Sequence, residues 1–256
     1  MEVQAGSAGT VSHGFWDLYS KHYDSVYHLM PYRKMLWDAF AALDLRPGMK
    51  VLDAGCGTGN FERFMSEKHP PAIEVEAFDF SPSMLEVARG KCAALEWVHF
   101  CQGDLNARLP FPDASFDCVV SINVMYTLPD RDHTMQELLR VLKPGGRLVI
   151  TGPAPGYRWA PLVAEHFRRV RNIWGTGRQA LSVLSSVGML CTSAVGAFLL
   201  NVFVIYRREK AGEYHAMDET ELRTFLGEHR RDGLGDFSIM PSFAAQNLFA
   251  TALKAA

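Results

Sequence analysis

A glycine-rich turn between an expected strand and an expected helix constrains the fold of this chain more than any other feature. The apolar run Lys50–Ala54 leads into glycines at alternate positions, Gly55, Gly57 and Gly59, and a helical pattern begins at Phe61. Glycine adopts backbone conformations closed to other residues and has no side chain to hold a ligand away. We therefore expect the backbone of this turn to approach a ligand at the end of a buried strand.

Two familiar nucleotide-binding motifs do not fit the turn. A dinucleotide fingerprint needs its third glycine three residues after the second, and this chain has Asn60 there. A P-loop needs Gly-Lys followed by Ser or Thr, which the turn lacks. The alternative is a tight turn that binds nothing, and residues near the ends of the next strands make this alternative less favoured.

Short β-rich runs and helical runs alternate along the chain. The expected strands are Lys50–Ala54, Glu74–Phe78, Val98–Gln102, Phe116–Ile122 and Arg147–Thr151. The expected helices between them are Phe61–Lys68, Ser83–Cys92 and Thr134–Leu142, and Lys143-Pro144-Gly145-Gly146 is expected to separate the last helix from the fifth strand. Right-handed crossovers place each helix on a face of the sheet, so this order predicts a parallel sheet covered on both sides.

Segments outside this alternation complete the predicted fold. We expect two helices within Phe15–Leu43, a capped helix at Met217–Glu228, and closing strands at Phe237–Met240 and Leu248–Lys254. The fold class is α/β: a doubly wound, seven-stranded, mostly parallel sheet with a helical cap inserted after the fifth strand. The expected parts are a disordered tail (1–14), a ligand-binding core (15–152), a helical cap (153–216) and a C-terminal helix with the closing strands (217–256).

The composition favours a small-molecule ligand. Lys+Arg number 26 against 28 Asp+Glu, a formal charge of -2, whereas nucleic-acid binding usually demands a strongly basic face. The five cysteines form no Cys-x-x-Cys pair, so neither a disulfide framework nor a metal site is expected. Met1–Thr10 lacks the basic and apolar regions of a secretory signal. We expect a cytoplasmic protein that binds no metal and no nucleic acid.

Polar residues also follow the next two expected strands. Asp79 ends the second strand, where an acidic side chain can accept hydrogen bonds from both hydroxyls of a ribose. Gly103-Asp104-Leu105 follows the third strand and offers a carboxylate to an exocyclic adenine amine and a backbone N–H to a ring nitrogen. Because ligands of open α/β sheets bind at the carboxyl edge of the strands, the three features together favour a nucleoside-containing ligand.

Five segments in this order resemble the signatures of class I S-adenosylmethionine-dependent methyltransferases, specifically the type-11 or ubiquinone/menaquinone-like group. They are Val51–Asn60, Phe78–Leu85, Gln102–Asp104, Leu109–Asp117 and Leu139–Gly146. The resemblance covers roughly Tyr19 to Thr151 and implies S-adenosylmethionine as the cofactor. A non-catalytic S-adenosylmethionine-binding regulatory or scaffold protein on the same fold is the alternative.

The resemblance also implies roles for individual residues. The glycine turn would line the methionine part of the cofactor, and Asp79 would hold its ribose. A Tyr-Asp pair before the first strand, Tyr23 and Asp24, would cover the cofactor, and Asn123 would lie beside the reactive sulfonium. The implied cofactor-binding set is Tyr23, Asp53, Gly55, Cys56, Gly57, Gly59, Asp79, Phe80, Met84, Gly103, Asp104, Leu105 and Asn123.

The chemistry of this family is direct displacement on an already activated methyl group, for which the protein mainly supplies alignment. An alcohol or an enolisable carbon would also need a base. The base candidates near the expected active-site edge are His133, Tyr126, Tyr214 and His215. Methyltransferases that act on exocyclic amines of DNA usually carry Asn/Asp-Pro-Pro-Tyr after the fourth strand. This chain has Asn-Val-Met-Tyr at 123–126, which disfavours nucleic-acid modification.

A run of 28 residues, Gln179–Tyr206, contains no Asp, Glu, Lys or Arg. It is long enough to span a membrane, but the residues after it must return to complete the sheet, so a single crossing is disfavoured. One interpretation is a pair of buried cap helices over the pocket. The other is a lid that binds a lipophilic acceptor or touches a membrane surface. Basic and aromatic residues on both flanks favour the lid: Arg158, Trp159, Arg168, Arg169, Arg171, Trp174, Arg178, Arg207, Arg208 and Lys210.

Overall fold

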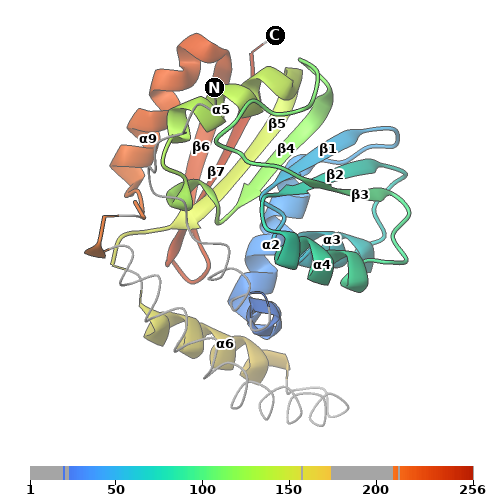
Figure 1. Ribbon diagram of the computed structural model, residues 1–256. Helices are drawn as coiled ribbons and strands as arrows, with labels where there is room; N and C mark the ends of the chain where they lie inside the picture. Colours follow the sequence, from blue (N-terminus) through green and yellow to red (C-terminus); the bar gives the residue numbers. More distant parts are fainter. Residues whose placement is uncertain (1–19, 21–22, 157, 174–209, 213, 256) are drawn as a thin grey trace, which may run out of the picture.

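The computed structural model describes residues 20, 23–156, 158–173, 210–212 and 214–255. Its centre is a seven-stranded sheet in the order β3-β2-β1-β4-β5-β7-β6 (Figure 1). The strands are β1 (Lys50–Ala54), β2 (Glu74–Asp79), β3 (Val98–Gln102), β4 (Phe116–Ile122), β5 (Leu142–Pro153), β6 (Leu234–Ser242) and β7 (Asn247–Lys254). The first five are parallel and β7 runs antiparallel to β5 and β6, which confirms the predicted fold class.

Helices cover both faces of the sheet. Before and between the first strands they are η1 (Asp24–His28), α2 (Met30–Leu43), α3 (Asn60–Glu67) and α4 (Pro82–Lys91). After β4 they are η2 (Met125–Thr127), α5 (Arg131–Val141), α6 (Trp159–Ile173), α9 (Glu219–Glu228) and η4 (His229–Asp232). Of the predicted cap, α6 is described and lies beside α2 (Figure 1). The run Gln179–Tyr206 and residues 1–19 lie outside the described residues.

The alternation of side chains along each strand builds two separate cores. Val51 on β1 packs in one core with residues of α2 and α3, and the next residue, Leu52, packs in the other with residues of α5 and α9. Val120 and Val119 on β4 divide in the same way. Because successive residues of a strand point to opposite faces, a continuous apolar strand serves both layers of helices.

The largest difference from the sequence prediction is the start of β5. The segment expected to separate helix and strand, residues 143–146, belongs to β5, which begins at Leu142 instead of Arg147. The pairing of β5 with β4 shifts within this segment, since Leu142 pairs with Phe116 and Arg147 with Cys118. Gly145, with a φ of 73°, lies within this irregular segment. The Lys143 ammonium donates to Asp117 Oδ1 on β4 at 2.8 Å.

Capping residues account for smaller differences at helix ends. Helix α5 begins three residues before the expected Thr134, because the Asp130 side chain accepts the His133 N–H and caps the helix. Helix α9 begins two residues after the expected Met217. Asp218 caps it, and the Asp218 and Glu221 side chains each accept the other's backbone N–H in a capping box.

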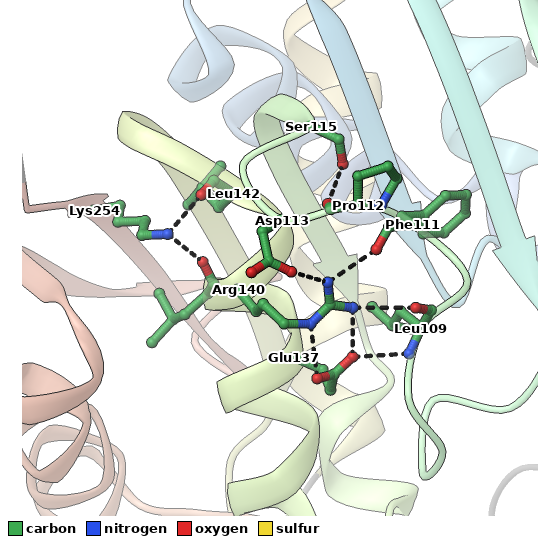
Figure 2. Close-up of polar contacts among 10 residues, drawn as sticks. Leu109, Phe111, Pro112, Asp113, Ser115, Glu137, Arg140, Leu142 and Lys254 are labelled. Atoms are coloured by element: carbon green, nitrogen blue, oxygen red, sulfur yellow. Dashed lines mark hydrogen bonds and ion pairs between the residues drawn. The ribbon is translucent and has the colours of Figure 1, made fainter.

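Arg140 binds the long loop between β3 and β4 to helix α5 (Figure 2). Its guanidinium makes a bidentate ion pair with Glu137, at 2.9 and 2.7 Å, and donates to the backbone oxygens of Leu109 and Phe111. It also pairs with Asp113 at 2.7 Å. Glu137 in turn accepts the Leu109 N–H at 2.8 Å. The loop that begins with the predicted adenine-binding residues is therefore held by one partly buried cation.

Candidate active site

The glycine turn and Asp79 meet at the carboxyl edge of the sheet. Strands β1 and β2 are parallel neighbours, so the turn after β1 lies against the end of β2. The N–H groups of Gly55 and Cys56 both donate to the Phe78 oxygen, at 2.7 and 3.1 Å. Burial raises the pKa of the Cys56 thiol well above its usual range, and the Cys56 side chain packs with the apolar core.

The three glycines of the turn share a left-handed backbone but differ in what surrounds them. Their φ angles are 91° at Gly55, 55° at Gly57 and 76° at Gly59. A Cβ at Gly55 would lie 2.3 Å from a methyl group of Val124, and one at Gly59 would lie 3.1 Å from Ala88. A Cβ at Gly57 would meet no described atom within 4 Å. Protein packing thus accounts for Gly55 and Gly59, and Gly57 alone has open space above it for a ligand.

Asp79 holds the open part of this turn. Its Oδ2 accepts the Gly57 N–H at 2.9 Å, and its Oδ1 accepts the Ser81 N–H at 2.9 Å. Burial raises the pKa of the Asp79 carboxyl, and hydrogen bonds from backbone N–H groups oppose that rise. Three backbone N–H groups, those of Ser81, Gly57 and Phe80, bind this carboxylate, so about one of its four lone-pair positions remains to accept a ribose hydroxyl.

Replacing Asp79 by alanine is expected to weaken cofactor binding by about 1–3 kcal/mol, the cost of leaving buried polar groups without their charged partner. The loss comes from a ribose hydroxyl and from the Gly57 N–H, both of which would lose their acceptor. Calorimetric titration measures the dissociation constant, and the midpoint of thermal unfolding shows whether the variant is folded. An unchanged dissociation constant would exclude the role of Asp79.

Two buried carboxyl groups lie next to the turn, and no cation of the described residues is bound directly to them. Asp53 is the second-last residue of β1 and Glu62 lies in the first turn of α3. Apart from each other, their oxygens have no hydrogen-bond partner among the described residues. Burial raises the pKa of both groups, and the adjacent Glu62 raises that of Asp53 further. Such a pair suits a ligand that carries positive charge, because a cation would offset the cost of burying the carboxylates.

Lys91, at the end of α4, joins the turn to the N-terminal segment. Its ammonium lies 2.6 Å from Asp24 Oδ1 and 2.8 Å from Asn60 Oδ1. The Thr58 hydroxyl donates to the same Asp24 oxygen at 2.6 Å. Asp24 therefore ties η1 to the turn. Tyr23 precedes η1 and lies near Asp53 and Asp79, and burial raises the pKa of its hydroxyl. This position is compatible with the expected cover over the cofactor.

The remaining predicted cofactor contacts follow β2 and β3. Met84 and Leu105 are buried, and Phe80 is partly exposed. Asp104 is exposed, and its Oδ1 accepts the Asn106 backbone N–H at 2.9 Å. A Cβ at Gly103 would lie 2.3 Å from the Phe78 ring, so packing on this ring explains the glycine.

Three of the four base candidates come together beyond β4. The rings of Tyr126, in η2, and Tyr214 meet edge to face with centroids 5.4 Å apart. The His215 N–H donates to the Tyr126 backbone oxygen at 3.0 Å, and Arg131 donates to the His215 oxygen at 3.3 Å. His133 lies in the first turn of α5 and interacts electrostatically with Glu137, which faces the loop held by Arg140.

Comparison with known proteins gives one sequence family and one fold. A family model described as a methyltransferase domain matches residues 45–193. The demethylmenaquinone methyltransferase of Staphylococcus aureus (strain JH9) is 38% identical over 133 residues, 51% of this chain and 55% of that protein. The chain thus spans about half the length of the curated relatives it matches.

Solved structures share the architecture at low sequence identity. A SAM-dependent methyltransferase from Aquifex aeolicus has a TM-score of 0.60 at 16% identity, covering 96% of this chain and 100% of that chain. The cyclase SpnF has a TM-score of 0.55 at 18% identity, covering 87% of this chain and 80% of that chain. At these identities the likeness shows the fold alone, and the activity depends on the residues of the site.

Proposed function

Because the chain belongs to the class I S-adenosylmethionine-dependent methyltransferases, we propose that it transfers the methyl group of that cofactor to a small lipophilic acceptor. The open space over Gly57, beside the buried carboxylate of Asp79, is the observation that carries the proposal. A bound S-adenosylmethionine supplies a methyl group that its positively charged sulfur already activates.

The residues of the site fit the parts of this cofactor. Gly57 offers its backbone to close approach, and Asp79 can accept a ribose hydroxyl. Asp53 and Glu62 form a buried carboxyl pair, and a cationic ligand beside it would favour the ionised form of the pair. The expected adenine contacts, Asp104 and Leu105 with Phe80 and Met84, follow the ends of the neighbouring strands. Direct displacement then depends on how well the chain aligns donor and acceptor.

An acceptor that must lose a proton would need a base near β4. Among the candidates, Tyr126 contacts both Tyr214 and His215. We propose that this group removes a proton from a hydroxyl-bearing acceptor. An acceptor that is already anionic would need none of these residues.

The lipophilic character of the acceptor is supported by the sequence and by one relative. The run Gln179–Tyr206 has no charged residue and must be covered by protein, ligand or lipid. It follows β5, whose carboxyl end lies at the edge where the acceptor approaches. The matched relative is named for demethylmenaquinone, a quinone. We propose that this run forms a lid over the acceptor.

We also propose that this lid contacts an anionic membrane surface. Two of the flanking arginines should contribute less attraction to such a surface than the others. Arg168 and Arg169 both pair with Glu165, at 2.7 and 2.5 Å, so their charge is partly neutralised. Among the described residues, no helix is long and apolar enough to span a membrane.

We expect faster methylation of a naphthoquinol that carries an isoprenoid chain than of the same naphthoquinol without it. Each buried methylene contributes about 0.8 kcal/mol, or about fourfold in kcat/KM until encounter becomes limiting. Formation of S-adenosylhomocysteine measures turnover. A water-soluble catechol tests preference for a polar acceptor.

Equal or faster turnover of the polar acceptors would contradict a lipophilic site. Binding of S-adenosylmethionine without any S-adenosylhomocysteine formation would instead favour a non-catalytic binding protein. Cosedimentation with anionic vesicles, weakened by salt, would support contact of the lid with a membrane surface.

A further inference from the structure

Three polar side chains from distant parts of the chain meet at the carboxyl edge of the sheet. Asn123 follows β4, Thr151 lies on β5, and Asn247 begins β7. Because β7 runs antiparallel to β5, its first residue lies at the edge where the parallel strands end. The Asn123 side-chain oxygen, Oδ1, accepts hydrogen bonds from Asn247 Nδ2 at 2.6 Å and from the Thr151 hydroxyl at 3.2 Å.

The backbone of Asn123 is fixed as firmly as its side chain. Its φ of 57° lies in the left-handed region, which asparagine tolerates better than most residues. Its N–H donates to the Thr151 backbone oxygen at 3.0 Å and approaches the Thr151 hydroxyl at 3.2 Å. Thr151 and Asn247 are both buried, so the two groups that hold Asn123 are rigid and shielded from water.

The donors decide which way the Asn123 amide faces. The Asn247 amide nitrogen can only donate, so the side of Asn123 that meets it is the carbonyl oxygen, and the Thr151 hydroxyl, which can donate or accept, donates to the same oxygen. The other N–H of Asn247 is directed to the Met35 sulfur at 3.6 Å, which stabilises the Asn247 amide in this orientation. The Asn123 N–H2 group faces away from β5 and β7, and among the described residues it has no hydrogen-bond partner.

This free donor lies beside the cofactor site. The next residue, Val124, packs against Gly55, and Ser121 donates its hydroxyl to Ala54 of β1 at 2.9 Å. The strand order reverses between β1 and β4, the usual position of a ligand in such a sheet. The expected nucleoside contacts, Asp79 and Asp104, lie at the ends of β2 and β3. A bound nucleoside would occupy that side, so an acceptor would approach from the side of β4 and β5.

We propose that Asn247 and Thr151 are positioning residues that hold the Asn123 amide with its N–H2 group toward an oxygen atom of the methyl acceptor. The proposal rests on the proposed methyltransferase function for the identity of the ligand. A donor fixed in this way binds an acceptor oxygen with little loss of side-chain freedom, and it stabilises negative charge that remains on that oxygen during transfer.

Asn247→Leu, which has a similar volume and no donor, tests the proposal. With the isoprenoid naphthoquinol as acceptor, kcat/KM should fall about 10- to 100-fold, the range of a lost hydrogen bond to a charged group. The dissociation constant of S-adenosylmethionine, measured by calorimetry, should change less than about threefold, a smaller loss than one ordinary hydrogen bond. Thr151→Val should also lower kcat/KM, whereas Thr151→Ser, which keeps the hydroxyl, should have the kcat/KM of the wild type.

Nitrogen-15 spectra of the side-chain amides provide a readout without turnover. In the cofactor-free wild type, Asn123 should give one sharp pair of N–H2 signals, and the Asn247 signals should exchange slowly with solvent. In Asn247→Leu the Asn123 signals should broaden as the amide rotates. Unchanged Asn123 signals, or equal losses in kcat/KM and in cofactor affinity, would overturn the proposal. If the wild type methylates no acceptor, the proposed function fails, while the spectra still decide the positioning role.

Discussion

Replacing Arg140 by alanine is expected to lower the free energy of unfolding by about 3–5 kcal/mol, the usual cost of removing one partner of a buried ion pair. The Arg140 side chain is 18% exposed and that of Glu137 is 11% exposed, so Glu137 would remain as a buried carboxylate without its cation. Two backbone oxygens of the loop between β3 and β4 would lose their donor. Urea unfolding measures the change.

Asp113→Asn is the matched control, because it removes the other carboxylate bound to Arg140. The Asp113 side chain is 72% exposed, and such pairs contribute about 0–1 kcal/mol. Hydrogen bonds from Arg140 lower the pKa of Glu137, so the stabilisation is complete above the normal glutamate pKa and lost as the pH falls through the lowered one. An Arg140→Ala variant that is as stable as Asp113→Asn, or that loses stability with acid as the wild type does, would contradict this role of Arg140.

Most of the fold could be predicted from the sequence because its signals are local. Apolar runs alternate with helical periodicity, and the handedness of crossovers leaves few arrangements for such an order. The start of β5 could not be predicted in this way. The Pro-Gly-Gly sequence is typical of a segment that separates a helix from a strand. Its place in β5 depends on contacts with β4, which are the pairing of Leu142 with Phe116 and the ion pair of Lys143 with Asp117.

For the site too, local sequence motifs could be predicted, whereas contacts between residues distant in the chain could not. The sequence identified the glycine turn, yet it could not separate Gly57 from Gly55, because Val124 lies on another strand end. Lys91 and Asn247 carry no motif, and their partners Asp24 and Asn123 are far away in the chain. Glu62 could have been noticed in the sequence, because it is an acidic residue among the buried apolar positions of α3.

Gly57→Asn is expected to reduce S-adenosylmethionine affinity at least about 100-fold, or about 2.7 kcal/mol, while the protein stays folded. Asparagine tolerates the left-handed backbone required at φ 55°, and no described atom obstructs its Cβ. Its side chain would occupy the space that the cofactor needs. Gly48→Asn is the control, because Gly48 has a φ of 83°, equally open surroundings and a position before β1 at the opposite edge of the sheet.

Calorimetric titration of S-adenosylmethionine into the wild type, Gly57→Asn and Gly48→Asn is the most direct test of the cofactor site. Thermal unfolding of the same samples shows that each is folded. We expect saturable binding at one site in the wild type and in Gly48→Asn, and no measurable heat in Gly57→Asn. Absence of binding in the wild type, or equal affinity in all three proteins, would contradict the assignment of this turn as the cofactor site.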